Sequence, residues 1–95
     1  MTWAVIVSDE ALADLDRLAV FLADRDPAAA RRAVRRPRGA ILSLRDKPRR
    51  GRPGSREDLR EMVVPFGQGV YVVRYRVGAD QVIVARIFHG LEDRG

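Results

Sequence analysis

The stretch "YVVRYRVGADQVIVARIFHG", residues 71–90, constrains the fold most, because two runs of β-branched and aromatic residues flank a Gly-Ala-Asp turn. This pattern predicts a β-hairpin with strands over 70–77 and 81–89. Three arginines and the only histidine of the chain also lie in the stretch. Their side chains form either the solvated side of a two-faced sheet or a surface that contacts or reacts with a partner.

The placement of these arginines depends on the register of the hairpin, since a shift of one residue moves every side chain to the other face. If Val77 pairs with Gln81 across a three-residue loop, the three arginines share one face. These residues are Arg74, Arg76 and Arg86. A two-residue loop would place one of them opposite the other two. We favour the three-residue loop because it gathers apolar side chains in one helix-covered layer. That layer would contain Tyr71, Val73, Tyr75, Ile83, Ala85 and Ile87.

The N-terminal part of the chain predicts a strand followed by an amphipathic helix. Residues 3–7 alternate as a short strand. Ser8 is a typical N-cap, and the two acidic residues after it suit the positive end of a helix dipole. Leucines then recur at helical spacing, which predicts a helix over 9–24 with one apolar stripe.

A second helix is expected over 27–45, with Asp26 as its cap and Pro27 at its first position. Pro37 lies inside this segment, where a proline removes a backbone hydrogen bond and costs about 3 kcal/mol. The helix therefore either kinks near Arg36 or divides into two shorter helices, and both alternatives stay open.

The remaining segments complete an α+β fold. Residues 45–58 form a loop rich in proline and glycine, and residues 59–64 form a strand that leads into the hairpin. The expected order is β-α-α-β-β-β: an N-terminal strand, a two-helix hairpin and a three-strand antiparallel meander in one small, mainly antiparallel sheet. A chain of 95 residues suits one compact domain, so we expect a single domain over 1–95.

Composition narrows the classes of function. The chain has no cysteine, which excludes disulfides and thiolate metal sites and suits a reducing cytoplasm. A single histidine argues against a zinc or iron site. No apolar stretch approaches the roughly 20 residues that cross a bilayer. We therefore expect a cytoplasmic protein without metal, cofactor or membrane partner.

The net charge of +5 is concentrated in the middle of the chain. Residues 31–60 hold twelve basic residues against three acidic ones, whereas residues 1–30 hold two against six and residues 61–95 hold four of each. Only one of the 18 basic residues is lysine, which a GC-rich genome explains in part. The placement of the basic block indicates a polyanion or an acidic protein as partner.

Several strings, taken together, resemble the ParE/RelE toxin superfamily of bacterial type II toxin–antitoxin systems. They are "DPAAARR", "KPRRGRP", "LREMVVP", "YVVRYRV" and "VARIFHGLEDR", with Asp14 and Leu15 in the first helix, and they cover nearly the whole chain. The resemblance implies a small sheet against a helical hairpin, and a cognate ParD-like antitoxin that forms a hetero-oligomer with the toxin. The residues expected to contact the antitoxin are Leu12, Leu18, Phe21, Val34 and Ile41.

Two activities divide this superfamily. RelE-like members cut messenger RNA in the ribosome, and many carry an arginine at the position that Val72 occupies here. If this chain is such a nuclease, its candidate catalytic residues are Arg74, Arg86 and His89. ParE-like members poison DNA gyrase, and their C-terminal pattern resembles residues 86–93 of this chain.

We favour a toxin that binds DNA gyrase and is neutralised by its antitoxin, and therefore a binding protein over an enzyme. A ribosome-dependent mRNA endoribonuclease is the alternative, and an inactive relative that only binds an antitoxin is a third possibility. The residues expected to contact the target are Arg52, Arg56, Arg60, Arg74, Arg76, Arg86, His89 and Asp93.

Overall fold

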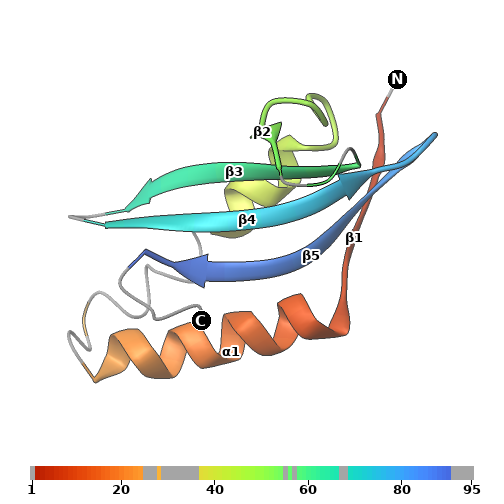
Figure 1. Cartoon of the computed structure of the whole chain (residues 1–95). Coiled ribbons are helices and arrows are strands. Elements are labelled where there is room, and N and C mark those ends of the chain that lie inside the picture. The colour runs from red at the N-terminus through yellow and green to blue at the C-terminus, as the bar shows by residue number, and fades with distance from the viewer. Residues whose placement is uncertain are drawn as a thin grey trace.

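The computed structural model confirms an α+β fold built on one five-stranded sheet (Figure 1). It describes residues 2–24, 28, 37–54, 56, 58–66 and 69–90, without the side chain of Phe66. The elements are β1 (Ala4–Val7), α1 (Asp9–Ala23), β2 (Arg52–Pro53), β3 (Leu59–Phe66), β4 (Gly69–Val77) and β5 (Gln81–His89). Residues 37–43 are also helical. The strand order is β1-β5-β4-β3-β2, with β1 parallel to β5 and the other neighbours antiparallel.

Most of the predicted elements agree with the structure to within one or two residues. The short strand β2 was not predicted, since two residues show no periodicity. It lies inside the segment expected to be a loop, and pairs with β3 through Arg52–Glu61 and Pro53–Arg60. Pro53 cannot donate a backbone hydrogen bond, which suits a strand at the edge of a sheet.

The second helix lies only partly within the described residues. Ala28 and residues 37–43 are helical, and Pro37 is fully buried. The rest of the predicted segment, including Arg36, lies outside the described residues, and so does the choice between a kink and two helices. Within the described part of the chain, no helix has the length and apolarity that a membrane span requires.

Both helical segments pack on the same face of the sheet, which we call the covered face. Leu18 and Leu22 of α1 and Ile41 of segment 37–43 join the core with residues such as Tyr71 and Val73 of the sheet. Figure 1 shows segment 37–43 behind β3 and β4, while α1 runs along β5. The opposite face carries Arg74, Arg76 and Arg86, and we call it the arginine face.

The β4–β5 hairpin contains a β-bulge that the sequence pattern did not reveal. The predicted pairing of Val77 with Gln81 is wrong, because Val77 pairs with Val82. The register then shifts by one, with Ala85 as the extra residue. From Arg86 onward, each residue of β5 again faces the side of the sheet that the predicted three-residue loop implied.

Because of the bulge, the residues that β5 contributes to the core differ in part from the predicted ones. Val82 and Val84 are fully buried on the covered face, in the places expected for Ile83 and Ala85. Ile87 lies beyond the bulge and is buried as predicted. A uniform strand cannot place Val84 and Ile87 on one face, since they are three residues apart. The bulge absorbs the extra residue and makes the shared face possible.

Candidate functional site on the arginine face

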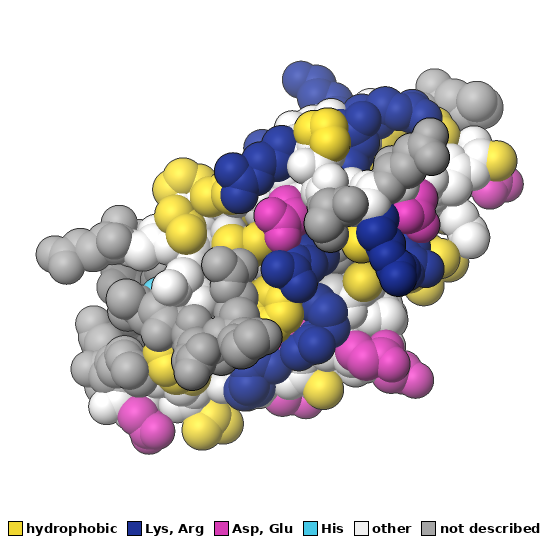
Figure 2. Space-filling model, viewed as in Figure 1, with side chains coloured by type: hydrophobic (Ala, Val, Ile, Leu, Met, Phe, Trp, Pro, Cys, Tyr) yellow, Lys and Arg dark blue, Asp and Glu magenta, His cyan; other side chains and the backbone are white. Residues whose placement is uncertain are grey.

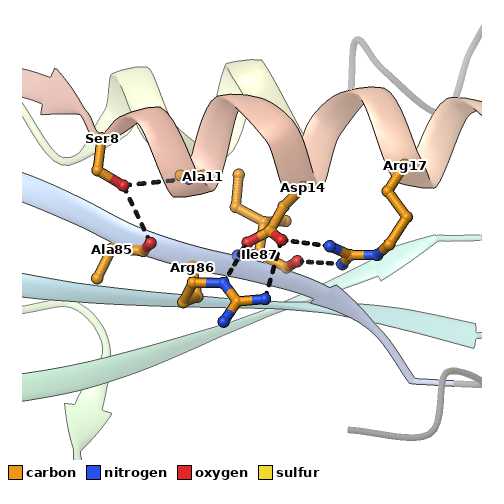
Figure 3. Close-up of polar contacts among 7 residues, drawn as sticks. All are labelled: Ser8, Ala11, Asp14, Arg17, Ala85, Arg86 and Ile87. Carbon is orange, nitrogen blue, oxygen red and sulfur yellow. Dashed lines mark hydrogen bonds and ion pairs between the residues drawn. The ribbon is translucent and has the colours of Figure 1, made fainter.

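Helix α1 replaces β1 as the neighbour of β5 at the point where β1 ends. The parallel pairing of β1 with β5 stops at Val84. Ser8 follows β1 directly, and its Oγ accepts a hydrogen bond from the Ala11 N–H at 3.1 Å, which caps the helix as predicted. The same hydroxyl donates to the carbonyl of the bulge residue Ala85 at 3.0 Å (Figure 3). One side chain therefore starts the helix and anchors the bulge.

Farther along, two side chains of α1 bind the backbone of β5. Asp14 Oδ2 accepts a hydrogen bond from the Ile87 N–H at 2.7 Å, and Arg17 Nη2 donates to the Ile87 carbonyl at 3.0 Å (Figure 3). Asp14 and Arg17 also form an ion pair with each other. An unpaired strand edge leaves polar backbone groups exposed. At Ile87 a carboxylate and a guanidinium serve as the hydrogen-bond partners that a neighbouring strand would provide.

Asp14 also holds Arg86 through two hydrogen bonds. Arg86 Nε donates to Oδ2 at 2.8 Å, and Nη2 donates to Oδ1 at 3.1 Å. Burial alone would raise the pKa of Asp14, which is only 2% exposed. The hydrogen bonds from Arg86, the Ile87 N–H and Arg17 outweigh burial, and the pKa lies below its usual value. The hydrogen bond to Asp14 in turn raises the pKa of Arg86. Both groups are charged at neutral pH.

A row of charges crosses the arginine face beside this pair. Arg74 lies directly opposite Arg86 in the hairpin and opposite Glu61 on its other side. Its Nε donates to Glu61 Oε2 at 2.7 Å, and this hydrogen bond is the main cause of the lowered pKa of Glu61. Arg52 of β2 lies 3.5 Å from the other oxygen of that carboxylate. The two central arginines are like charges that repel. Glu61 and Asp14 flank them and compensate the repulsion.

Phe88 lies among these arginines on the same face. Its ring centroid is 4.9 Å from the guanidinium carbon of Arg86, 5.1 Å from that of Arg74 and 5.9 Å from that of Arg17. Cations at such distances are attracted to the face of an aromatic ring. Three cations, Arg17, Arg74 and Arg86, thus surround the ring of Phe88. Figure 2 shows Lys and Arg side chains gathered in a band across this face, with hydrophobic side chains between them.

His89 lies on the covered face, away from the candidate catalytic partners Arg74 and Arg86. Its side chain is 3% exposed, and its ring centroid is 5.7 Å from that of Phe21 and 5.4 Å from that of Tyr71. Burial raises the pKa of Tyr71 to about 12. The structure therefore brings two of the three candidate catalytic residues together and places the third on the other side of the sheet.

Arg60 holds the loop before β2 in place. Its Nη1 donates to the carbonyl of Gly51 at 2.7 Å and to that of Arg49 at 3.4 Å. The Gly51 N–H donates to the hydroxyl of Tyr75 at 2.8 Å, a contact in the interior. Arg60 was expected to contact the target, and its hydrogen bonds with the chain's own backbone give it a structural role as well.

The other predicted target contacts lie at several places. Arg52 and Arg56 are exposed. Arg76 lies on the arginine face, 3.6 Å from a carboxylate oxygen of Asp58, in an exposed ion pair. Asp93 lies outside the described residues. The structure therefore groups Arg52, Arg74, Arg76 and Arg86 on or beside one face of the sheet.

The residues expected to contact an antitoxin divide into exposed and buried ones. Leu12 of α1 is 49% exposed, and Phe21 is partly buried against the core. Leu18 and Ile41 belong to the core of this chain. Val34 lies outside the described residues. Leu12 is therefore the residue of this group best placed to contact a partner.

Asp14 and Glu61, which position the arginines, were not among the predicted site residues. Asp14 could have been noticed because it lies on the apolar stripe of the first helix, between Ala11 and Leu18, where a charge is unexpected. The position of Glu61 opposite Arg74 could not have been foreseen without the strand register. Among the described residues, no group of three or more His, Asp or Glu side chains is arranged to hold a metal ion.

The architecture matches that of a solved bacterial toxin–antitoxin structure. A chain of the "Chromosomal ParDE TA system from P. aeruginosa" superposes with a TM-score of 0.77 at 20% sequence identity, covering 90% of this chain and 94% of that chain. This likeness defines the class of fold: a small sheet with helices on one face, as in that toxin–antitoxin system.

Sequence comparison assigns the family. The model of the "ParE toxin of type II toxin-antitoxin system, parDE" matches residues 5–94. Toxin RelE1 of Caulobacter vibrioides is 47% identical over 94 residues, which cover 99% of this chain and 100% of that protein. Toxin RelE3 of the same organism is 38% identical over 91 residues, covering 96% and 98%. The chain belongs to the ParE toxin family of type II toxin–antitoxin systems, and the resemblance seen in the sequence is confirmed.

Proposed function

We propose that this toxin arrests growth by binding and poisoning DNA gyrase, and that it acts by contact and not as a nuclease. The observation that supports this proposal is the separation of the arginines from the groups that could transfer protons. Ribonuclease cleavage needs an acid and a base beside the group that stabilises the phosphate.

All the imidazole and phenol groups of the chain lie on the covered face. The chain has one histidine and two tyrosines, which are His89, Tyr71 and Tyr75. All three are buried, and burial raises the pKa of both tyrosines. Such phenols are poor proton donors and acceptors at neutral pH. The described face that carries Arg74 and Arg86 offers charge and shape, which suits a binding surface.

The carboxylates on the arginine face also suit binding better than proton transfer. A general base works best with a pKa near the working pH. Hydrogen bonds with arginines lower the pKa values of Asp14 and Glu61, which makes both carboxylates weaker bases. Their role in the proposal is to hold Arg86 and Arg74 in position.

The alternative is a ribosome-dependent mRNA endoribonuclease, and one observation favours it. Two relatives that align over nearly the whole chain carry the name RelE. Under this alternative, His89→Gln would reduce message cleavage roughly 100-fold or more, because proton transfer contributes about that much. Under our proposal, the same variant changes toxicity only as far as it changes stability.

We also propose that a ParD-like antitoxin neutralises the toxin in a hetero-oligomer. The net charge of +5 suits a partner with an acidic segment, since complementary charge accelerates and orients the encounter. Leu12 is an exposed apolar side chain on α1 and is a candidate contact for that partner.

Two measurements test the target. The toxin is induced alone in bacteria while DNA and protein synthesis are pulse-labelled in parallel, and purified toxin is added to a gyrase supercoiling assay. We expect DNA synthesis to fail first and supercoiling to be inhibited. Early loss of translation with cut messages, or supercoiling that continues at toxin concentrations that stop growth, would contradict the proposal.

A further inference from the structure

We propose that Arg74 and Arg86 together form a binding site for a backbone phosphate of duplex DNA. The Phe88 ring packs against both arginines, and Glu61 and Asp14 are positioning residues. This inference rests on the proposed function, since it names the part of a gyrase–DNA complex that the arginine face would touch.

The two carboxylates bind one side of each guanidinium and leave the rest available. Arg74 uses one of its five N–H donors, its Nε–H, on Glu61. Arg86 uses two of its five, on Nε and Nη2, on Asp14. Within the described part of the chain, the other donors of this pair have no hydrogen-bond acceptor. The side chains of Arg74 and Arg86 are 43% and 45% exposed, so a ligand can reach them.

The positions of the two arginines suit a shared anion. They are directly opposite each other in the β4–β5 ladder, and both guanidinium carbons lie within about 5 Å of the centre of the Phe88 ring. Like charges directly opposite each other in a sheet repel. An oxyanion between them would relieve that repulsion and accept hydrogen bonds from both, and a phosphate matches the planar fork of arginine.

The surroundings favour a polyanion over a single carboxylate. Arg17 adds a third cation at the Phe88 ring, and Arg52 reaches Glu61 from β2. More exposed arginines continue from there in the loop, and Figure 2 shows the basic side chains as a band and not as a single point. These loop residues are Arg49, Arg50 and Arg56. A row of phosphates meets such a band at several places, as duplex DNA carries one charge per about 1.7 Å of its axis.

The test measures binding of purified toxin to a fluorescein-labelled 20-base-pair duplex at several salt concentrations. Non-specific affinity is expected on the order of 10⁻⁵ M at physiological salt. Arg74→Gln is expected to weaken binding about tenfold through loss of a charge-assisted hydrogen bond. The same change should lower the slope of log K against log salt by about one. Arg86→Gln should act similarly.

Matched controls show whether a loss of binding comes from the phosphate site or from the lower net charge alone. Arg38→Gln removes the same charge from the exposed side of segment 37–43, on the covered face, and should leave the salt slope unchanged. Arg86→Gln removes a partner of the buried Asp14, so its folding is checked by circular dichroism. Arg74→Gln removes a hydrogen bond to the partly exposed Glu61 and a contact with the Phe88 ring, and leaves no buried charge unpaired. It decides the question if the Arg86 variant does not fold. Equal binding by the Arg74 and Arg38 variants overturns the proposal.

Additional measurements distinguish the class of ligand and separate this proposal from the proposed function. A glutamate-rich peptide, or a single-stranded RNA of equal charge, that binds ten times more tightly than the duplex overturns the assignment to DNA. If wild-type toxin inhibits gyrase and does not bind the duplex, the proposed phosphate site is wrong and the proposed function stands. If it binds the duplex through Arg74 and leaves gyrase active, the proposed phosphate site is supported and the proposed function is wrong.

Discussion

Asp14 of α1 accepts two hydrogen bonds from the guanidinium of Arg86 in β5, at 2.8 and 3.1 Å, across 72 positions of the chain. The same carboxylate binds the backbone N–H of the next residue, Ile87. The position of the first helix and the position of an exposed arginine on the sheet are therefore coupled. A change at Asp14 affects both the stability of the fold and the geometry of the arginine face.

Asp14→Asn is expected to destabilise the protein by about 3 kcal/mol, since one partner of a buried ionic network is removed. The asparagine amide would direct N–H donors toward groups that are themselves donors, namely Arg86 and the Ile87 N–H. Urea denaturation measures the change, and the melting temperature should fall by about 15 °C. Asp16→Asn on the exposed side of the same helix is the control and should change stability by less than about 0.5 kcal/mol. Equal effects of the two variants would contradict a special role for Asp14.

Acid should destabilise the protein through Asp14 and Glu61. Both carboxyls have lowered pKa values in the folded state, so the unfolded state binds more protons at low pH. The stabilisation is complete above about pH 5 and is lost as the pH falls through about 4 toward the folded pKa values. Urea denaturation at several pH values between 3 and 7 measures this loss. Glu61→Gln should make the pH dependence shallower, and a stability that rises toward acid would refute the assignment.

Gly51→Ala should destabilise the protein by about 2 kcal/mol through overpacking. A Cβ at Gly51 would lie 2.6 Å from the hydroxyl of Tyr75 and 2.7 Å from the Glu61 carbonyl. Gly39→Ala is the matched control, because a Cβ there meets no atom within 4 Å and alanine is favoured in a helix. It should be neutral or stabilising by up to about 1 kcal/mol. Thermal unfolding of the pair separates the two cases, and a tolerated alanine at Gly51 would mean that the loop before β2 moves easily.

Leu12→Asp should weaken antitoxin binding at least tenfold, a loss of about 1.4 kcal/mol. Stability should change little, since the side chain is half exposed in the free toxin. Val63→Asp, at an exposed position on the arginine face of β3, introduces the same charge away from α1 and is the control. Calorimetric titration with the cognate antitoxin measures both affinities. Unchanged binding by the Leu12 variant would remove α1 from the proposed interface.

Local sequence signals predicted most of the secondary structure because the interactions that specify it are local. Ser8 caps α1 through a residue only three positions away, and alternation located β1 and the β4–β5 hairpin. Periodicity also predicted that Arg74 and Arg86 share a face, which the structure confirms. The predicted loop was nevertheless wrong, and the agreement depends on the bulge at Ala85.

Only the tertiary structure decided which groups meet at the arginine face. Ser8, which is far from the bulge residue Ala85 in the chain, binds its carbonyl just beyond the point where the pairing of β1 with β5 ends. Asp14 meets Arg86 only because α1 continues along β5 where β1 ends. The sequence by itself determined the class of fold, the family and the basic character of the protein, through periodicity, local motifs and charge. Register and long-range packing placed His89 in the core and the arginines around Phe88, and no local pattern encodes those contacts.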